Sequence, residues 1–123
     1  MQGPGQCPPA MHELSIMESA LNLALEQARQ SGSRRVDVIR LRIGALSGVV
    51  PEALEFAFTA LAPGTAAEHS QLVIEAVPAR FWCEACHTEF EWEDLLAECP
   101  QCHELSRELR TGRELELASL DVA

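Results

Sequence analysis

In the first third of the chain, apolar residues recur every three or four positions, which is the spacing of one face of an α-helix. Ser15, with Glu18 three residues later, has the form of a capping box and sets the expected helix start at Ser15. Gly32 can adopt the left-handed conformation that ends helices, so a helix is predicted over residues 15–30. The apolar stripe of this helix is expected to comprise Leu14, Met17, Leu21, Leu25 and Ala28.

The pattern then changes to the alternation of a β-strand over residues 35–44. Pro51 suits the first position of a second helix, which ends before Pro63. Two further strands are predicted over residues 71–77 and 114–122. The residues expected to face the core from the first strand and the second helix are Ile39, Leu41 and Ile43, and Leu54, Ala57, Phe58 and Leu61.

This order of elements predicts an α+β fold, with two helices on a small three-stranded sheet and an inserted zinc-ribbon module. Residues 80–110 are the expected metal-binding module, and residues 11–79 together with 111–123 are the expected α+β domain. Residues 1–10 are rich in proline and glycine and are interpreted as a flexible tail or a misread start.

Four of the five cysteines occur as two Cys-x-x-Cys pairs separated by twelve residues. Each pair can wrap one metal ion, and two pairs complete a tetrahedron of sulfur ligands. Zinc favours such closed sites for structure, while a rubredoxin-like iron site and a redox dithiol are the alternatives. The predicted ligands are Cys83, Cys86, Cys99 and Cys102.

Two histidines and four aromatic residues accompany the cysteines. His87 and His103 directly follow the second cysteine of each pair. Their favoured role is a hydrogen bond toward sulfur or water, and the alternative is that either one replaces a thiolate. The aromatic residues are expected to form the small core of the module, against the alternative of an exposed platform for nucleic acid bases. They are Phe81, Trp82, Phe90 and Trp92.

Charge and hydropathy argue against several classes of protein, namely nucleic-acid-binding, secreted and membrane-spanning proteins. Nineteen Asp and Glu residues against nine Lys and Arg residues give a net charge of −10, which repels phosphate backbones, so nucleic acid is not an expected partner. The chain start lacks the features of a signal peptide, and no segment has the roughly 20 apolar residues of a membrane span. A cytoplasmic protein without a membrane partner is expected. No phosphate-binding loop or catalytic triad is recognisable, so an enzyme is not predicted.

Four motifs in one order resemble the HypA/HybF family, the nickel metallochaperones of hydrogenase maturation. The resemblance extends from Met11 to about Val122. It implies a structural zinc ion, transient Ni(II), delivery to the large subunit precursor of [NiFe] hydrogenase, and cooperation with a HypB-type GTPase. The motifs are Met11-His12-Glu13-Leu14-Ser15, Leu41-Arg42-Ile43-Gly44, Pro51-Glu52-Ala53-Leu54 and the two cysteine pairs.

The same resemblance implies a nickel site at Met11-His12-Glu13, with the His12 imidazole as ligand, a backbone nitrogen from Met11, and Glu13 as an accessory residue. Nickel(II) favours square-planar nitrogen donors, and a histidine next to a free amine supplies them in adjoining chelate rings. Ten residues precede Met11 here, so either translation begins at Met11 or His12 binds through internal amides as far back as Ala10. Glu52 is a further candidate ligand, with stabilisation of a helix N-terminus as its alternative role.

Two other functional classes stay open on the residues alone. A zinc-ribbon interaction module would need no nickel site, and a thiol redox protein would form reversible disulfides within each cysteine pair.

Overall fold

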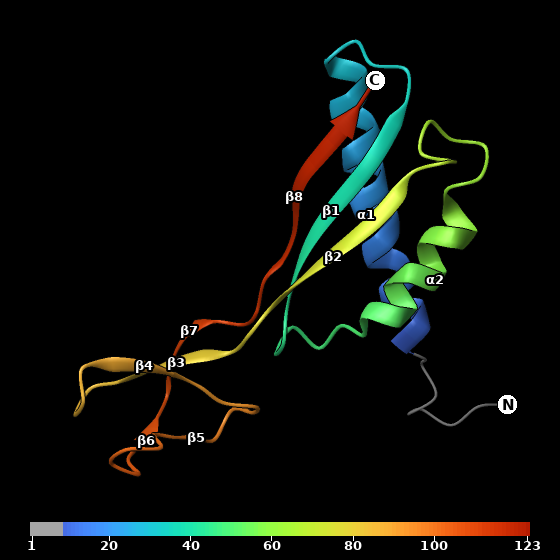
Figure 1. The fold of residues 1–123 in the computed structure, drawn as a ribbon. Coiled ribbons are helices and arrows are strands. Elements are labelled where there is room, and N and C mark those ends of the chain that lie inside the picture. Colours follow the sequence, from blue (N-terminus) through green and yellow to red (C-terminus); the bar gives the residue numbers. More distant parts are fainter. Residues whose placement is uncertain (1–8) are drawn as a thin grey trace, which may run out of the picture. The chain divides into compact units, whose positions relative to one another are not determined.

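The computed structural model describes residues 9–123 (Figure 1). Its helices and strands follow the predicted order, and the α+β class is confirmed. Within the described residues, no helix is long and apolar enough to cross a bilayer. The elements are α1 (Pro9–Gln30), β1 (Val36–Gly44), α2 (Pro51–Leu61), β2 (Gln71–Val77), β3 (Arg80–Cys83), β4 (Thr88–Glu91), β5 (Ala97–Glu98), β6 (Leu105–Ser106), β7 (Glu108–Thr111) and β8 (Leu115–Val122).

The chain divides into two compact units. The helical unit contains the described residues up to Leu41, with Val49–Ile74 and Glu116–Ala123. The cysteine unit contains Arg42–Gly48 and Glu75–Leu115. The domain boundaries expected from the sequence stay a prediction, and residues 1–8 of the expected tail lie outside the described residues.

Helix α1 begins six residues before the predicted start, because it opens at Pro9 and not at Ser15. Proline is well suited to the first turn of a helix, where its missing N–H has no intrahelical acceptor in any case. The capping-box interpretation of Ser15 was therefore wrong, and Pro9 and Ala10, expected in the tail, belong to the helix. The predicted end is confirmed, since Gly32 follows the helix with a φ of +80°.

The buried stripe of α1 also differs from the predicted one. Leu14 is exposed and Leu25 only half-buried, whereas Met17, Leu21 and Ala28 are buried as expected. The remaining positions of the stripe are taken by Ala24 and by Glu13, whose side chain is fully buried.

Strand β1 is the central strand of a three-stranded sheet with the order β2-β1-β8 (Figure 1). Its predicted core residues, Ile39, Leu41 and Ile43, are all buried. Helix α2 packs against α1 and buries Leu54, Ala57 and Phe58. The helical unit therefore has an aliphatic core supplied by both helices and the sheet.

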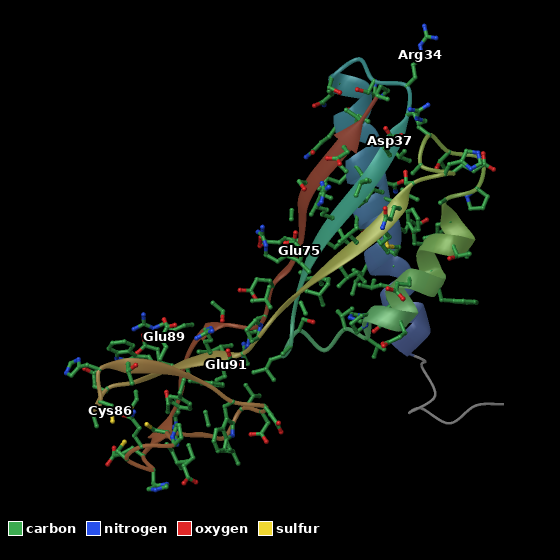
Figure 2. All side chains as sticks on the ribbon, in the orientation of Figure 1. Arg34, Asp37, Glu75, Cys86, Glu89 and Glu91 are labelled. Atoms are coloured by element: carbon green, nitrogen blue, oxygen red, sulfur yellow. The ribbon has the colours of Figure 1, made fainter. Side chains whose placement is uncertain are left out.

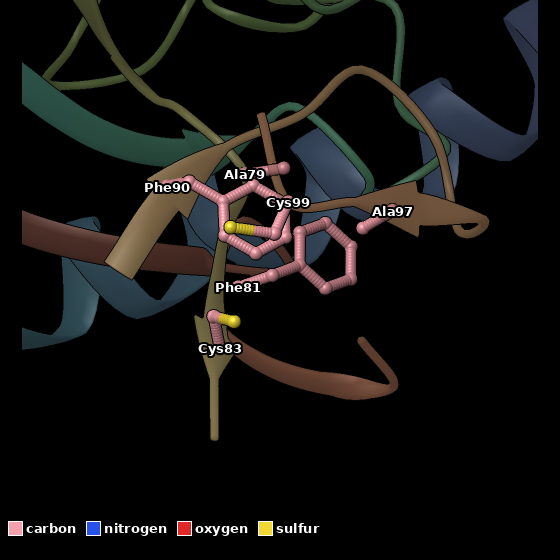
Figure 3. Close-up of a cluster of buried hydrophobic side chains, with 6 residues drawn as sticks. All are labelled: Ala79, Phe81, Cys83, Phe90, Ala97 and Cys99. Atoms are coloured by element: carbon pink, nitrogen blue, oxygen red, sulfur yellow. The ribbon is translucent and has the colours of Figure 1, made fainter. Parts of the chain in front are cut away.

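The cysteine unit contains a three-stranded antiparallel sheet with the order β4-β3-β7 and a two-stranded ribbon of β5 and β6. In β3 the side chains alternate, with Phe81 and Cys83 buried and Trp82 between them half-buried. Figure 3 shows the small core that results, formed by Ala79, Phe81, Cys83, Phe90, Ala97 and Cys99.

Two glycines allow the chain segments of the cysteine unit to approach closely. A Cβ atom on Gly44 would collide with the backbone of Gly112, and the Leu46 N–H donates to the Gly112 carbonyl oxygen at 2.6 Å. Gly112 itself has a φ of +124°, which disfavours any residue with a side chain. This contact joins the β1 end of the unit to the segment that leads into β8.

Candidate metal sites

The four predicted cysteine ligands converge at one point of the cysteine unit. Their sulfur atoms all lie within 4.8 Å of one another, although the pairs are far apart in sequence. The sulfurs of Cys83 and Cys102 lie 3.5 Å apart, and those of Cys86 and Cys99 lie 4.0 Å apart. Figure 2 shows yellow sulfur atoms gathered near the labelled Cys86.

These distances fit a tetrahedral metal ion. Zinc–sulfur bonds of about 2.3 Å in a regular tetrahedron place the sulfurs roughly 3.8 Å apart, close to the separations in this cluster. Cys83 and Cys99 are buried, while Cys86 and Cys102 are half-buried. The residues present therefore fit a closed metal centre with four thiolate ligands, and such a centre has no open position for substrate.

The backbone of each Cys-x-x-Cys turn supports the first sulfur of its pair. The Cys86 N–H donates to the sulfur of Cys83 at 3.4 Å. In the second turn, a backbone hydrogen bond from Cys102 is the largest cause that lowers the pKa of the Cys99 thiol to about 7. The neighbouring thiol of Cys102 is the largest cause that raises the pKa of Cys86 to about 12.

His87 and His103 have the same backbone conformation in the two turns. Their φ angles are 51° and 65°, in the left-handed region that is uncommon for residues other than glycine, although histidine enters it more often than most. The His103 Nδ1 atom lies 2.8 Å from a carboxylate oxygen of Glu98, and the His87 ring meets the Trp82 ring edge-on at 6.0 Å. A hydrogen bond from either histidine to sulfur stays a prediction.

The aromatic residues divide between two environments. Phe81 and Phe90 are both buried, and their rings lie side by side in Figure 3. The ring centroids are 6.0 Å apart, and Trp92 packs against this core. Trp82 lies outside that core, with the Arg110 guanidinium 4.6 Å from its ring centroid. Its indole N–H donates to Glu84 at 3.0 Å. The prediction that Trp82 belongs to the core was therefore wrong.

The predicted nickel residues lie at the start of the helical unit. His12 is exposed on α1, whereas the next residue, Glu13, is fully buried. Oε2 of Glu13 accepts a hydrogen bond of 2.8 Å from the Val50 N–H, just before α2. Glu52, in the first turn of α2, is exposed. The side chain of Met11 lies outside the described residues.

No second group of three or more His, Cys, Asp or Glu ligand atoms converges among residues 9–123. The hydrogen bond from Val50 to Glu13 was not predicted from the sequence. Helical periodicity contained a signal for the burial of Glu13 but not for its donor, because the stripe through Met17 and Leu21, extended one turn back, arrives at Glu13.

Comparison with known proteins decides the family. Residues 11–122 match the family model described as hydrogenase/urease nickel incorporation, metallochaperone, hypA. The chain belongs to the HypA family. The expected HypA/HybF resemblance is thus confirmed over nearly the whole chain, and with it the role of the family in nickel incorporation and hydrogenase maturation.

Two HypA proteins named hydrogenase maturation factor are similar over more than nine tenths of their length. The one from Picosynechococcus is 46% identical over 112 residues, which cover 91% of this chain and 99% of the relative. The one from Roseiflexus is also 46% identical over 112 residues, covering 90% of this chain and 91% of the relative.

Two solved structures of HypA proteins share the fold. The solution structure of the nickel metallochaperone HypA from Helicobacter pylori superposes with a TM-score of 0.62 at 22% identity, covering 89% of this chain and 96% of that one. A second solution structure of a HypA protein gives a TM-score of 0.68 at 23% identity, with 92% and 97% coverage.

Proposed function

We propose that the chain binds Ni(II) and delivers it to the large subunit precursor of [NiFe] hydrogenase in the cytoplasm, as a carrier and not as an enzyme. Membership of the HypA family over residues 11–122 supports nickel as the cargo. The structural observation that carries the proposal is the exposure of His12, next to the start of α1.

The proposed nickel donors are the imidazole of His12 and a backbone nitrogen of Met11. The first N–H groups of a helix have no intrahelical acceptor, and Met11 lies in the first turn of a helix that begins at Pro9. A backbone nitrogen is therefore available beside the imidazole. A few exposed donors bind nickel with moderate affinity and can be exchanged for the ligands of a receiving protein more readily than a closed cage. Glu13 is proposed as an accessory residue, and Glu52 as a further candidate.

The four cysteines are proposed to hold one structural zinc ion. Zinc has no redox chemistry and prefers tetrahedral thiolate sites of this kind, which contribute directly to folding. Cys83, Cys86, Cys99 and Cys102 supply all four ligands, so delivery of nickel is assigned to the other site. Iron is the alternative metal, and elemental analysis of the purified chain distinguishes the two.

The proposed partners are a HypB-type GTPase and the hydrogenase large subunit precursor. The family description includes urease as well as hydrogenase, so a urease apoprotein is a second possible recipient. A homodimer is compatible with this role. The net charge of −10 argues against nucleic acid as a partner.

Replacement of His12 tests the nickel site. We expect His12→Ala to lower nickel affinity at least about tenfold, because the strongest nitrogen donor is lost. The measurement is calorimetric titration of the full chain with nickel chloride near pH 7. His69→Ala is the matched control, since His69 is another exposed histidine of the helical unit. Equal nickel affinity in both variants would instead favour a zinc-ribbon interaction module without nickel delivery.

A further inference from the structure

Glu13 is a buried acid on the apolar stripe of α1. Its exposed fraction is 0%, and it occupies the stripe one turn before Met17, which is equally buried. Removing a carboxylate from water costs several kcal/mol unless it gains hydrogen bonds or an opposite charge. The partner of this carboxylate therefore indicates why an acid stands at this position.

The partner lies at the start of the other helix. The Val50 N–H donates to Oε2 of Glu13 at 2.8 Å. Val50 is the N-cap residue of α2, with extended backbone angles of −93° and 115°, and its apolar side chain makes no capping hydrogen bond. In a capping box, a Glu or Gln at the third helical position accepts from the N-cap N–H. That position is Ala53 here, so Glu13 supplies from α1 the acceptor that α2 lacks.

The N-terminus of α2 also supplies the favourable electrostatics. A negative charge is stabilised at a helix N-terminus by the partial positive charge of the free N–H groups. The other oxygen of Glu13, Oε1, accepts no hydrogen bond from the residues that the structure describes. The hydrogen bond that the structure shows to this carboxylate therefore comes from the N-terminus of α2.

We propose that Glu13 is a positioning residue that caps α2 from α1 and thereby holds His12 outward. Successive residues of an α-helix point about 100° apart, so fixing Glu13 toward α2 sets the direction of its neighbour. His12 is accordingly exposed while Glu13 is buried. This inference rests on the proposed function of His12 as a nickel ligand. It explains the accessory role of Glu13, which is to hold the His12 imidazole in place before nickel binds.

The experiment combines amide hydrogen exchange at Val50 with nickel titration in two variants of Glu13. In Glu13→Ala the Val50 N–H loses its acceptor, and we expect its exchange to accelerate at least about tenfold and nickel affinity to fall about tenfold. In Glu13→Gln the side-chain carbonyl can still accept, so most of the protection and of the affinity should be recovered. The internal reference is the Ala62 N–H, which donates to Phe58 at the other end of α2.

Two further variants separate the possible causes. Glu18→Ala removes an exposed glutamate of the same helix and should behave as the parent chain. Adding Ala53→Glu to Glu13→Ala restores a capping acceptor within α2 but no link to α1. It should slow Val50 exchange again without restoring nickel affinity, and it keeps the test available if Glu13→Ala alone is unfolded.

Each contrary result has a distinct meaning. Unchanged Val50 exchange in Glu13→Ala overturns the cap, and unchanged nickel affinity with fast Val50 exchange overturns the link to His12. Lost nickel affinity in Glu13→Gln with Val50 still protected shows that Glu13 binds the metal itself, and likewise overturns the positioning role. A parent chain that binds no nickel chloride refutes the proposed function together with the link to His12, while the exchange data, which need no nickel, still decide the cap.

Discussion

At the scale of single residues, two cysteines of the cluster, Cys86 and Cys99, have pKa values shifted in opposite directions. The pKa of Cys99 is lowered to about 7, chiefly by the backbone hydrogen bond from Cys102. The pKa of Cys86 is raised to about 12, chiefly by the hydrogen bond with the Cys102 thiol. A metal ion must displace the protons of its thiol ligands, so these two residues affect metal binding over different ranges of pH.

Zinc affinity should therefore rise with pH, and more steeply below pH 7 than above it. In the metal-free chain Cys86 is a thiol throughout the neutral range, and zinc must always expel its proton. Cys99 carries a proton below pH 7 and has largely lost it above, so its contribution to the slope disappears there. The slope of the logarithm of zinc affinity against pH should fall by about one across pH 7. Competition with a chromogenic chelator at several pH values measures it, and a constant slope would contradict this acidity of Cys99.

The acidity of Cys99 makes the stability of the folded, metal-free chain depend on pH in the same direction as zinc affinity. Its pKa is lower in the folded metal-free chain than the ordinary value of 9.0, so folding is favoured above pH 9 and this contribution is lost as the pH falls through about 7. Acid thus weakens both the fold around Cys99 and its metal binding.

Sequence spacing was sufficient to predict that the four cysteines converge, but insufficient to predict the environment of Glu13. Two Cys-x-x-Cys turns determine their own geometry through local hydrogen bonds, and the cluster follows. The burial of Glu13 depends on a backbone N–H at Val50, 37 residues later in the chain, and a backbone donor leaves no side-chain pattern. Trp82 was misplaced because strand alternation puts it opposite Phe81 and Cys83, which are the buried positions of β3.

At the scale of elements, the contact between α1 and α2 depends on a few residues of α2. Leu54 is fully buried and Phe58 nearly so, while Phe56 between them is 73% exposed. The larger aromatic side chain of Phe56 thus contributes little to the core of the helical unit, whereas the smaller Leu54 is enclosed on all sides.

Truncation of Leu54 should lower the stability of the chain far more than truncation of Phe56. We expect Leu54→Ala to lower the free energy of unfolding by about 2–5 kcal/mol, because it leaves a cavity in the core. Phe56→Ala should change it by less than about 0.5 kcal/mol, since little apolar area leaves or enters water. Urea denaturation followed by far-UV circular dichroism measures both. Similar losses in the two variants would contradict the burial of Leu54.

Element order and most boundaries could be predicted because local patterns and packing agree in this chain. Strand β2 matches its predicted residues, 71–77, and α2 begins at Pro51 as expected. The start of α1 was misplaced because Ser15 has the sequence of a cap while Pro9 offers an earlier start with no lost hydrogen bond. A capping pattern inside a longer helix is indistinguishable from a true cap without tertiary information.

At the scale of the whole molecule, the cores of the two units differ in the residues that form them. The helical unit buries aliphatic residues of α1, β1 and α2. Two of the six residues in the core of the cysteine unit, Cys83 and Cys99, belong to the four-cysteine cluster that fits a metal ion. A core of this size needs additional cross-links for stability, so the metal ion should be part of the fold of the cysteine unit and not an addition to it.

The two units can be observed separately in one sample. Both tryptophans, Trp82 and Trp92, belong to the cysteine unit, and the chain has no tyrosine. Among the described residues, both helices belong to the helical unit. Tryptophan fluorescence therefore reports on the cysteine unit, while the helical signal in far-UV circular dichroism reports on the other.

Loss of the metal should unfold the cysteine unit and leave the helical unit folded. We expect Cys99→Ala, or a strong chelator added to the parent chain, to abolish zinc binding and shift tryptophan emission to longer wavelength, while the helical signal changes little. Cys7→Ala is the matched control, because Cys7 belongs to neither Cys-x-x-Cys pair in the sequence, and this variant should retain both signals and one zinc ion. Stoichiometric zinc in Cys99→Ala would contradict the four-cysteine site. Simultaneous loss of the helical signal would show that the core of α1, β1 and α2 depends on the metal. An unchanged emission spectrum in zinc-free protein would show that Phe81 and Phe90 hold the cysteine unit together without the metal.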